Sequence, residues 1–314
     1  MKLSQLFEST EHNPYEEAHR NGELMIDLGE VPEIMLSGAG ISHFDWNKLT
    51  DYLSQLGDIE DAYSHRANDW KTKRVDIVLQ ECQQLESVDY GNANIRYLTI
   101  RDCNSYKKIQ IPTCTQVVIQ RMDHLDIVCE GVTIPEEYFA FQNCKIDSLK
   151  VNNCIGVCQT ISIIGSHIDK IQITNCNIEQ LQIQSESKIA YNDANRIECD
   201  VLSLETDIPD DICIDFRNAP TQYKFNEIDF FRSTVISSNW SKILMIPTLS
   251  KVIFFANAMW PNWMTVPSSV SNMNSFRLIF EDILKRTMQI EGGRKRVMFM
   301  SAEFEKYPEL NRML

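Results

Sequence analysis

The stretch that decides the fold runs from residue 146 to residue 178 and reads IDSLKVNNCIGVCQTISIIGSHIDKIQITNCNI. It contains one phrase twice, as Leu149-Lys-Val-Asn-Asn-Cys154 and as Ile171-Gln-Ile-Thr-Asn-Cys176. In this phrase two apolar residues alternate with other residues, and a cysteine follows three positions later. The alternation is typical of a strand with one buried face. A strand phrase that returns after a fixed interval predicts a stack of similar coils.

Further copies of the phrase form two interleaved series along the chain. The first series starts at Ile77, Leu98, Val117, Phe139, Ile161, Leu181 and Leu202, and the second starts at Ile109, Leu125, Leu149, Ile171 and Ile212. The first series advances by about 19 to 22 residues, which is a solenoid-like period. Two series predict that each coil carries two strand-like segments on opposite sides.

Two repeat families share this pattern. The run Ile168-x-x-Ile171-x-Ile173-x-x-Cys176 resembles the core of leucine-rich repeats, and the resemblance covers about residues 74 to 256. Leucine-rich repeats usually place a helix or a turn on the far side of each coil, whereas this chain places a second alternating segment there. That feature resembles a parallel β-helix. We therefore expect a β-solenoid of about 20–22-residue coils, either leucine-rich-repeat-like or a parallel β-helix.

The flanks differ from the repeats and predict caps. We expect an N-terminal mixed α/β cap over residues 1–70, a repeat solenoid over 71–257 and a C-terminal cap over 258–314. An amphipathic helix is predicted over residues 275–290, because apolar residues recur there at helical spacing. The open ends of a solenoid expose strand edges and apolar core, so both ends need covering.

Composition limits the class of partner. The chain has 314 residues and a formal net charge of −14, so a nucleic-acid backbone or an anionic membrane is not expected as the main partner. The first residues lack the apolar run of a signal peptide, which predicts a cytoplasmic protein or one packaged in a virion. Leu6-Phe-Glu8 resembles the Leu-x-Glu processing tripeptide of tailed-phage head proteins, and the resemblance implies a phage origin.

The ten cysteines are spaced like stacked core residues, and no Cys-x-x-Cys pair occurs among them. We therefore expect reduced, buried thiols and no metal site. Ser37-Gly-Ala-Gly-Ile-Ser42 resembles the Gly-Ala-Gly-x-Ser loop of sirtuins, which approaches the phosphates of NAD. The acidic-aromatic-Arg sequence expected shortly after that loop is missing, so we interpret the segment as a tight turn and expect no cofactor.

An acidic segment lies between residues 198 and 215. It includes Glu198, Asp200, Glu205, Asp207, Asp210 and Asp211. A cation site, a pair of glycosidase carboxylates, a docking surface for a basic partner and a solvated loop between coils all remain open for it. It contains no Asp-x-Asp-x-Asp-Gly calcium loop.

The middle residues of the first series should face outward, and they are uncharged and mostly small. They are Val78, Thr99, Val118, Ala140, Ser162, Gln182 and Ser203. The second series offers Gln110, Asp126, Lys150 and Gln172 instead, which are longer and more polar. In a chain with 24% charged residues, such a strip predicts that a partner protein, another subunit or a flank of the chain covers it.

These features favour a non-catalytic protein–protein interaction or structural module that presents a rigid repeat surface. The expected partner is a protein or a second copy of the chain. A carbohydrate-active β-helix enzyme and an acidic inhibitor that mimics nucleic acid are the alternatives. The enzyme predicts a groove lined by carboxylates and aromatic residues, and the mimic predicts a dense stripe of carboxylates.

Overall fold

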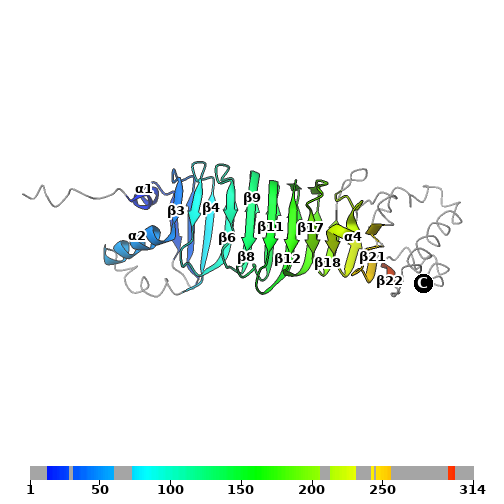
Figure 1. The fold of residues 1–314 in the computed structure, drawn as a ribbon. Helices are drawn as coiled ribbons and strands as arrows, with labels where there is room; N and C mark the ends of the chain where they lie inside the picture. Colours follow the sequence, from blue (N-terminus) through cyan, green and yellow to red (C-terminus); the bar gives the residue numbers. More distant parts are fainter. Residues whose placement is uncertain are drawn as a thin grey trace, which may run out of the picture.

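The chain forms a β-solenoid of about seven stacked coils with a spacing of about 22 residues. The computed structural model describes residues 13–27, 31–59, 73–205, 213–230, 242–243, 245–255 and 296–300. Figure 1 shows the strands following one another along a single axis, with helices α1 (Pro14–Arg20) and α2 (Trp46–Ile59) at the N-terminal end. The predicted solenoid architecture is confirmed.

One side of the solenoid is a 12-stranded sheet, which we call the large sheet. Its strands, in spatial order, are β1 (Leu24–Asp27), β2 (Glu33–Ser37), β4 (Val75–Gln80), β6 (Ile95–Arg101), β8 (Gln116–Gln120), β10 (Tyr138–Gln142), β12 (Val157–Ile164), β15 (Asn177–Gln184), β18 (Val201–Glu205), β20 (Glu227–Phe230), β21 (Lys251–Phe255) and β22 (Arg296–Met300). Only β1 and β2 pair antiparallel within this sheet.

The other side is an eight-stranded parallel sheet, which we call the small sheet. Its strands are β7 (Lys108–Gln110), β9 (Asp123–Glu130), β11 (Lys145–Asn152), β13 (His167–Ile168), β14 (Ile171–Thr174), β16 (Lys188–Ile189), β17 (Arg196–Glu198) and β19 (Tyr223–Lys224). Strands β3 (His43–Asp45) and β5 (Ser87–Asp89) form a separate pair, and α4 (Ala219–Gln222) precedes β19. The second alternating segment of each coil is therefore a strand.

The register of the large sheet follows the first series of phrases. Successive pairs align Ile77 with Leu98, Leu98 with Val117, and so on to Leu181 with Leu202. All of these side chains are buried between the two sheets. The periodic alternation was sufficient here because an in-register parallel sheet keeps the same face inward in every coil.

In the second series, the start at Leu125 was wrong. Leu125 pairs with Ile146, and Ile127 aligns with Ile109 on one side and Leu149 on the other. Leu125, Ile127 and Cys129 alternate and are all buried, so the phrase can be started at either of the first two. The register shifts on both sides of Ile146 and is then restored, so that Leu149 aligns with Ile127. Val128, not Asp126, is therefore the middle outward residue of β9. Ile212 lies outside the described residues.

In the six coils from β4 to β15, the chain turns at the end of the large-sheet strand through a residue with positive φ. The positions are Glu81, Asp102, Arg121, Asn143, Gly165 and Ser185, with φ between 50° and 57°. The side chain that follows the turn points inward and forms a corner ladder: Cys82, Cys103, Met122, Cys144, Ser166 and Ser187, all buried. Cysteine and serine share this position because both are small and both can donate to a carbonyl of the preceding coil.

The corner ladder satisfies backbone groups of neighbouring coils. The Cys144 thiol lies 3.5 Å from the carbonyl of Ile119, and the Ser187 hydroxyl lies 2.9 Å from that of Ile163. Ser166 accepts from the backbone N–H of Cys144 at 3.0 Å. All ten cysteines carry thiols, and eight of them are buried.

The large sheet extends beyond both predicted boundaries of the repeat region. The parallel sheet runs from β2 to β22 and so crosses both residue 70 and residue 257, and the division at these positions stays a prediction. The helix predicted over 275–290 lies outside the described residues. Among the described helices, none is long and apolar enough to span a membrane.

Candidate functional site

The outer side of the large sheet carries a block without charge in its central four strands. Three rows of side chains from β8, β10, β12 and β15 make up this neutral face: Gln116, Val118, Gln120, Tyr138, Ala140, Gln142, Thr160, Ser162, Ile164, Gln180, Gln182 and Gln184. Six of the twelve are glutamine. In a chain with 24% charged residues, this is a large departure from an ordinary surface.

The predicted strip forms the middle row of this face, and the pairing continues it onto neighbouring strands. Val78, Thr99, Val118 and Gln182 are half-buried, whereas Ala140, Ser162 and Ser203 are buried. The two rows beside them carry longer side chains, including Gln120, Tyr138 and Gln142. The strip is therefore the floor of the neutral face. The outermost atoms of the face belong to the flanking rows, which were not among the residues predicted from the sequence.

Hydrogen bonds order the amides of the neutral face. Gln120 donates to Gln142 across the strands at 2.6 Å. Gln182 donates to Gln180 at 2.8 Å, and Gln180 donates to Ser203 at 2.7 Å. On the floor, the Ser162 hydroxyl has no partner among the described residues, although its side chain is fully buried. The face thus combines ordered amides with one unsatisfied buried hydroxyl, which is an uncommon feature in proteins.

The outer side of the small sheet provides a contrast. Its middle strands carry charges that pair across coils, for example Lys150 with Glu130 at 2.7 Å. Lys224 pairs with Glu198 at 2.7 Å in the same way. Exposed ion pairs between neighbouring strands are common on the solvent-facing side of a sheet. The two faces of the solenoid therefore differ in chemistry, although both come from the same repeat.

Charged residues occur again on the large-sheet strands that follow the neutral face toward the C-terminus. Asp229 continues the middle row after Ser203 and is 7% exposed. Burial, with a smaller contribution from Glu227, raises the pKa of Asp229 to about 7. Glu227 itself pairs with Lys251 at 2.8 Å. This cluster is an acidic border of the neutral face.

The described members of the acidic segment do not form one cluster. Glu198 and Asp200 lie at the corner that leads from β17 into β18, whereas Glu205 lies at the far end of β18. Its remaining members, Asp207, Asp210 and Asp211, lie outside the described residues. The linear sequence could not show this division, because a strand of the large sheet separates the two ends.

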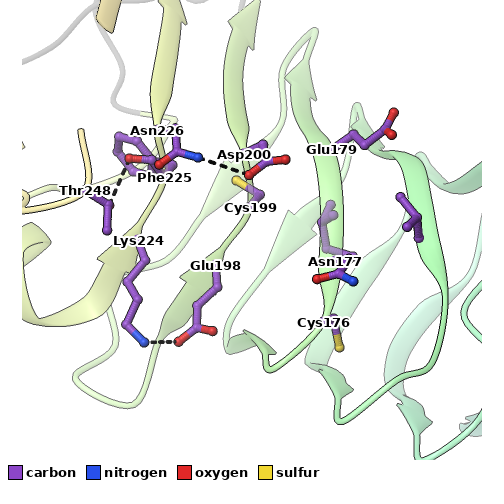
Figure 2. A pocket seen from close by; sticks show the side chains of 12 residues that line it. Cys176, Asn177, Glu179, Glu198, Cys199, Asp200, Lys224, Phe225, Asn226 and Thr248 are labelled. Atoms are coloured by element: carbon purple, nitrogen blue, oxygen red, sulfur yellow. Dashed lines mark hydrogen bonds and ion pairs between the residues drawn. The ribbon is translucent and has the colours of Figure 1, made fainter. Parts of the chain in front are cut away.

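A pocket of about 420 Å³ opens at the corner where Glu198 and Asp200 lie. This corner pocket is lined by residues 157, 176–179, 198–200, 224–226 and 248, which belong to five consecutive coils. Figure 2 shows Lys224 paired with Glu198, Asn226 bonded to Asp200, and Asn177 and Glu179 on the other side. Ile178 and Phe225 are buried members of its lining.

The Lys224 amine affects the carboxylates of the pocket unequally. Burial raises the pKa of Glu198, but the hydrogen bonds from Lys224 and from the Asn175 backbone outweigh it, so the pKa of Glu198 is lowered. No cation lies within ion-pairing distance of Asp200 or Glu179 among the described residues. Three carboxylates and one amine leave this pocket negative.

No metal or cofactor was expected from the sequence. Within the described part of the chain, no group of three or more His, Cys, Asp or Glu side chains is arranged to hold a metal ion. Ser37 ends β2, and Gly38 follows with a φ of 69° in a turn between strands. No family model matches this chain, and no curated protein or solved structure matches it.

Proposed function

We propose that the protein is a non-catalytic interaction module that binds a partner protein, or a second copy of itself, through the neutral face. The observation that supports this is the absence of charge from twelve adjacent side chains of a net-acidic chain. The cores of protein interfaces are depleted of charge and enriched in tyrosine, and their rims are polar. The neutral face shares the depletion of charge and contains Tyr138, and charged residues lie at both of its borders.

The rim can be identified residue by residue. Arg101 on β6 lies at one border of the neutral face, and Glu205 on β18 and Glu227 on β20 lie at the other. Opposite signs at the two borders would orient a partner along the solenoid axis. Each copy of the chain carries a net charge of −14. Two copies that dock through an uncharged patch would avoid placing like charges against each other.

The size of the neutral face sets a minimum footprint. Four strands spaced by about 4.8 Å, with rows spanning about 16 Å, give roughly 300 Å². A stable interface buries about 800 Å² on each partner. A tight complex would therefore extend beyond the neutral face onto β6 and β18, with the neutral face at its centre.

The test compares two matched variants. Each introduces one pair of opposite charges, the first on the large sheet and the second on the small sheet. Gln120→Lys/Gln142→Glu puts opposite charges on two residues that already bond in register, so the sheet should tolerate them. Asn152→Lys/Thr174→Glu makes the same change at a bonded pair on the small sheet. Both variants would first be checked for an unchanged circular dichroism spectrum.

Partner capture from lysate of the native host and sedimentation velocity would then be compared for the three proteins. We expect a captured partner, or a self-associated species, with wild type and with Asn152→Lys/Thr174→Glu, and its loss with Gln120→Lys/Gln142→Glu. Equal capture by all three proteins would place the interface elsewhere. The absence of both a partner and self-association would argue against a binding module.

A further inference from the structure

We propose that the corner pocket is a second, separate docking site, which binds an extended basic segment of a partner polypeptide. The segment would carry an apolar side chain next to lysine or arginine. The corner pocket lies on the edge between the two sheets and shares no residue with the neutral face. The proposal therefore stands or falls independently of the one above.

The shape of the pocket fits an extended chain. Val157, Asn177, Asp200, Asn226 and Thr248 come from five consecutive coils, so the lining follows the solenoid axis. Four steps of about 4.8 Å give a length of about 19 Å, which about six extended residues would span. A volume of about 420 Å³ is sufficient for two or three side chains.

One end of this pocket is apolar and open. Val157 is 43% exposed and Ile155 beside it is 67% exposed, and both belong to the large hydrophobic side chains that the described structure leaves at the surface. Ile178 and Phe225 continue the apolar surface into the pocket, where they are buried. An apolar side chain of a partner would remove Val157 and Ile155 from water.

The middle of the pocket is negative. Lys224 is committed to Glu198, with 2.7 Å between the charged atoms. Asp200 accepts one hydrogen bond from Asn226, and neither Asp200 nor Glu179 has a cationic partner among the described residues. Two uncompensated carboxylates beside an apolar surface favour a cation on an apolar stem, as lysine and arginine provide. They disfavour an acidic peptide or a nucleic acid.

The experiment starts from a library of random seven-residue peptides displayed on phage and selected on the full-length protein. The most enriched peptides would be synthesised with a fluorescent label, and their dissociation constants measured by anisotropy. The charge variant is Glu179→Gln/Asp200→Asn, which keeps the shape of both side chains. Glu186→Gln is the matched control, because the carboxylate of Glu186 is exposed and follows the end of β15, whereas Glu179 lies near the start of that strand.

We expect the enriched peptides to contain lysine or arginine next to an apolar residue. The charge variant should weaken their binding by about tenfold, whereas Glu186→Gln should leave it unchanged. Raising the salt concentration from about 50 mM to about 500 mM should also weaken it. Methyl NMR should show shifts at Ile155 and Ile178 upon addition of peptide.

Three results would overturn the proposal. The first is a selection without enrichment, or with enrichment of sequences that lack basic residues. The second is unchanged affinity in the charge variant. The third is methyl shifts at Val118 and Ile164 of the neutral face in place of Ile155 and Ile178, which would show that the peptides bind the other surface.

Discussion

Replacement of Ser166 by alanine tests the corner ladder that joins successive coils. The Ser166 hydroxyl is buried and accepts from the Cys144 N–H at 3.0 Å. It can donate to one of two carbonyls, that of Ile164 at 3.0 Å or that of Phe141 at 3.2 Å. Alanine removes both contacts and leaves a buried N–H without a partner, which costs about 1–3 kcal/mol. A second lost hydrogen bond adds about 1 kcal/mol. We therefore expect Ser166→Ala to lower the free energy of unfolding by about 2–4 kcal/mol.

Ser166→Cys gives the prediction its specificity. Cysteine occupies the equivalent corner in three other coils, at Cys82, Cys103 and Cys144. The thiol can still contact both backbone groups weakly, so we expect a loss below about 1 kcal/mol. Urea unfolding followed by far-UV circular dichroism measures both variants, with the half-buried Ser148→Ala as the control that should stay within about 0.5 kcal/mol of wild type. An alanine variant as stable as wild type, or a cysteine variant less stable than the alanine variant, would refute this account of the ladder.

Three further predictions concern backbone strain, protonation and thiol reactivity. Gly165→Ala should cost more than Gly131→Ala in thermal unfolding: both glycines have positive φ, but only at Gly165 would the added Cβ meet a neighbour, the amide oxygen of Asn143. The carboxyl of Asp229 should hold its proton up to about pH 7 in the folded state, whereas its ordinary pKa is 3.8. The free energy of unfolding should therefore fall by up to about 4 kcal/mol as the pH rises between these two values. Asp229→Asn should flatten this pH profile, and a slope that persists in the variant would assign the pH dependence to another group. Cys154 is half-buried, so mass spectrometry should find it alkylated by iodoacetamide before the eight buried cysteines, and simultaneous labelling of all of them would contradict the described packing.

The sequence was informative wherever a residue's role depended on its place within one coil. The alternation in phrases such as Leu98-Thr-Ile100 specified the inward face of every large-sheet strand from β4 to β18. It failed at Leu125 because Leu125, Ile127 and Cys129 alternate and are all buried, so alternation alone allows the phrase to start at either of the first two. The coil spacing of about 22 residues, counted back from Leu149, leads to Ile127 and would have selected the correct start.

Features that depend on contacts between coils were harder to predict. The corner ladder contains Met122 and Ser166 as well as cysteines, so a search for cysteine alone found only part of it. The positive φ of the residue before each corner, as at Asn143, could have been suspected from the Asn-Cys pairs, since asparagine tolerates this conformation. The corner pocket depends on how five coils stack, and no local pattern encodes it.

The same distinction applies to the candidate binding residues. Thr99 and Ser162 were correctly placed in one row, because outward positions follow from alternation. The burial of Ser162 was not predictable from that row alone, because alternation places the residue on the outer side of the sheet, where exposure is expected. The absence of charge from those rows is present in the sequence, and it becomes visible only when the strands are aligned in register.

The most direct test of the central claim is photo-crosslinking from the two faces of the solenoid. A photoreactive benzophenone amino acid would replace either Val118 or Val128, which are half-buried valines at the outward middle of β8 and β9. After irradiation in host lysate, the account predicts a covalent adduct with the partner, or with a second copy of the chain, from position 118 and none from position 128. An adduct from position 128 alone would contradict the neutral face as the binding surface.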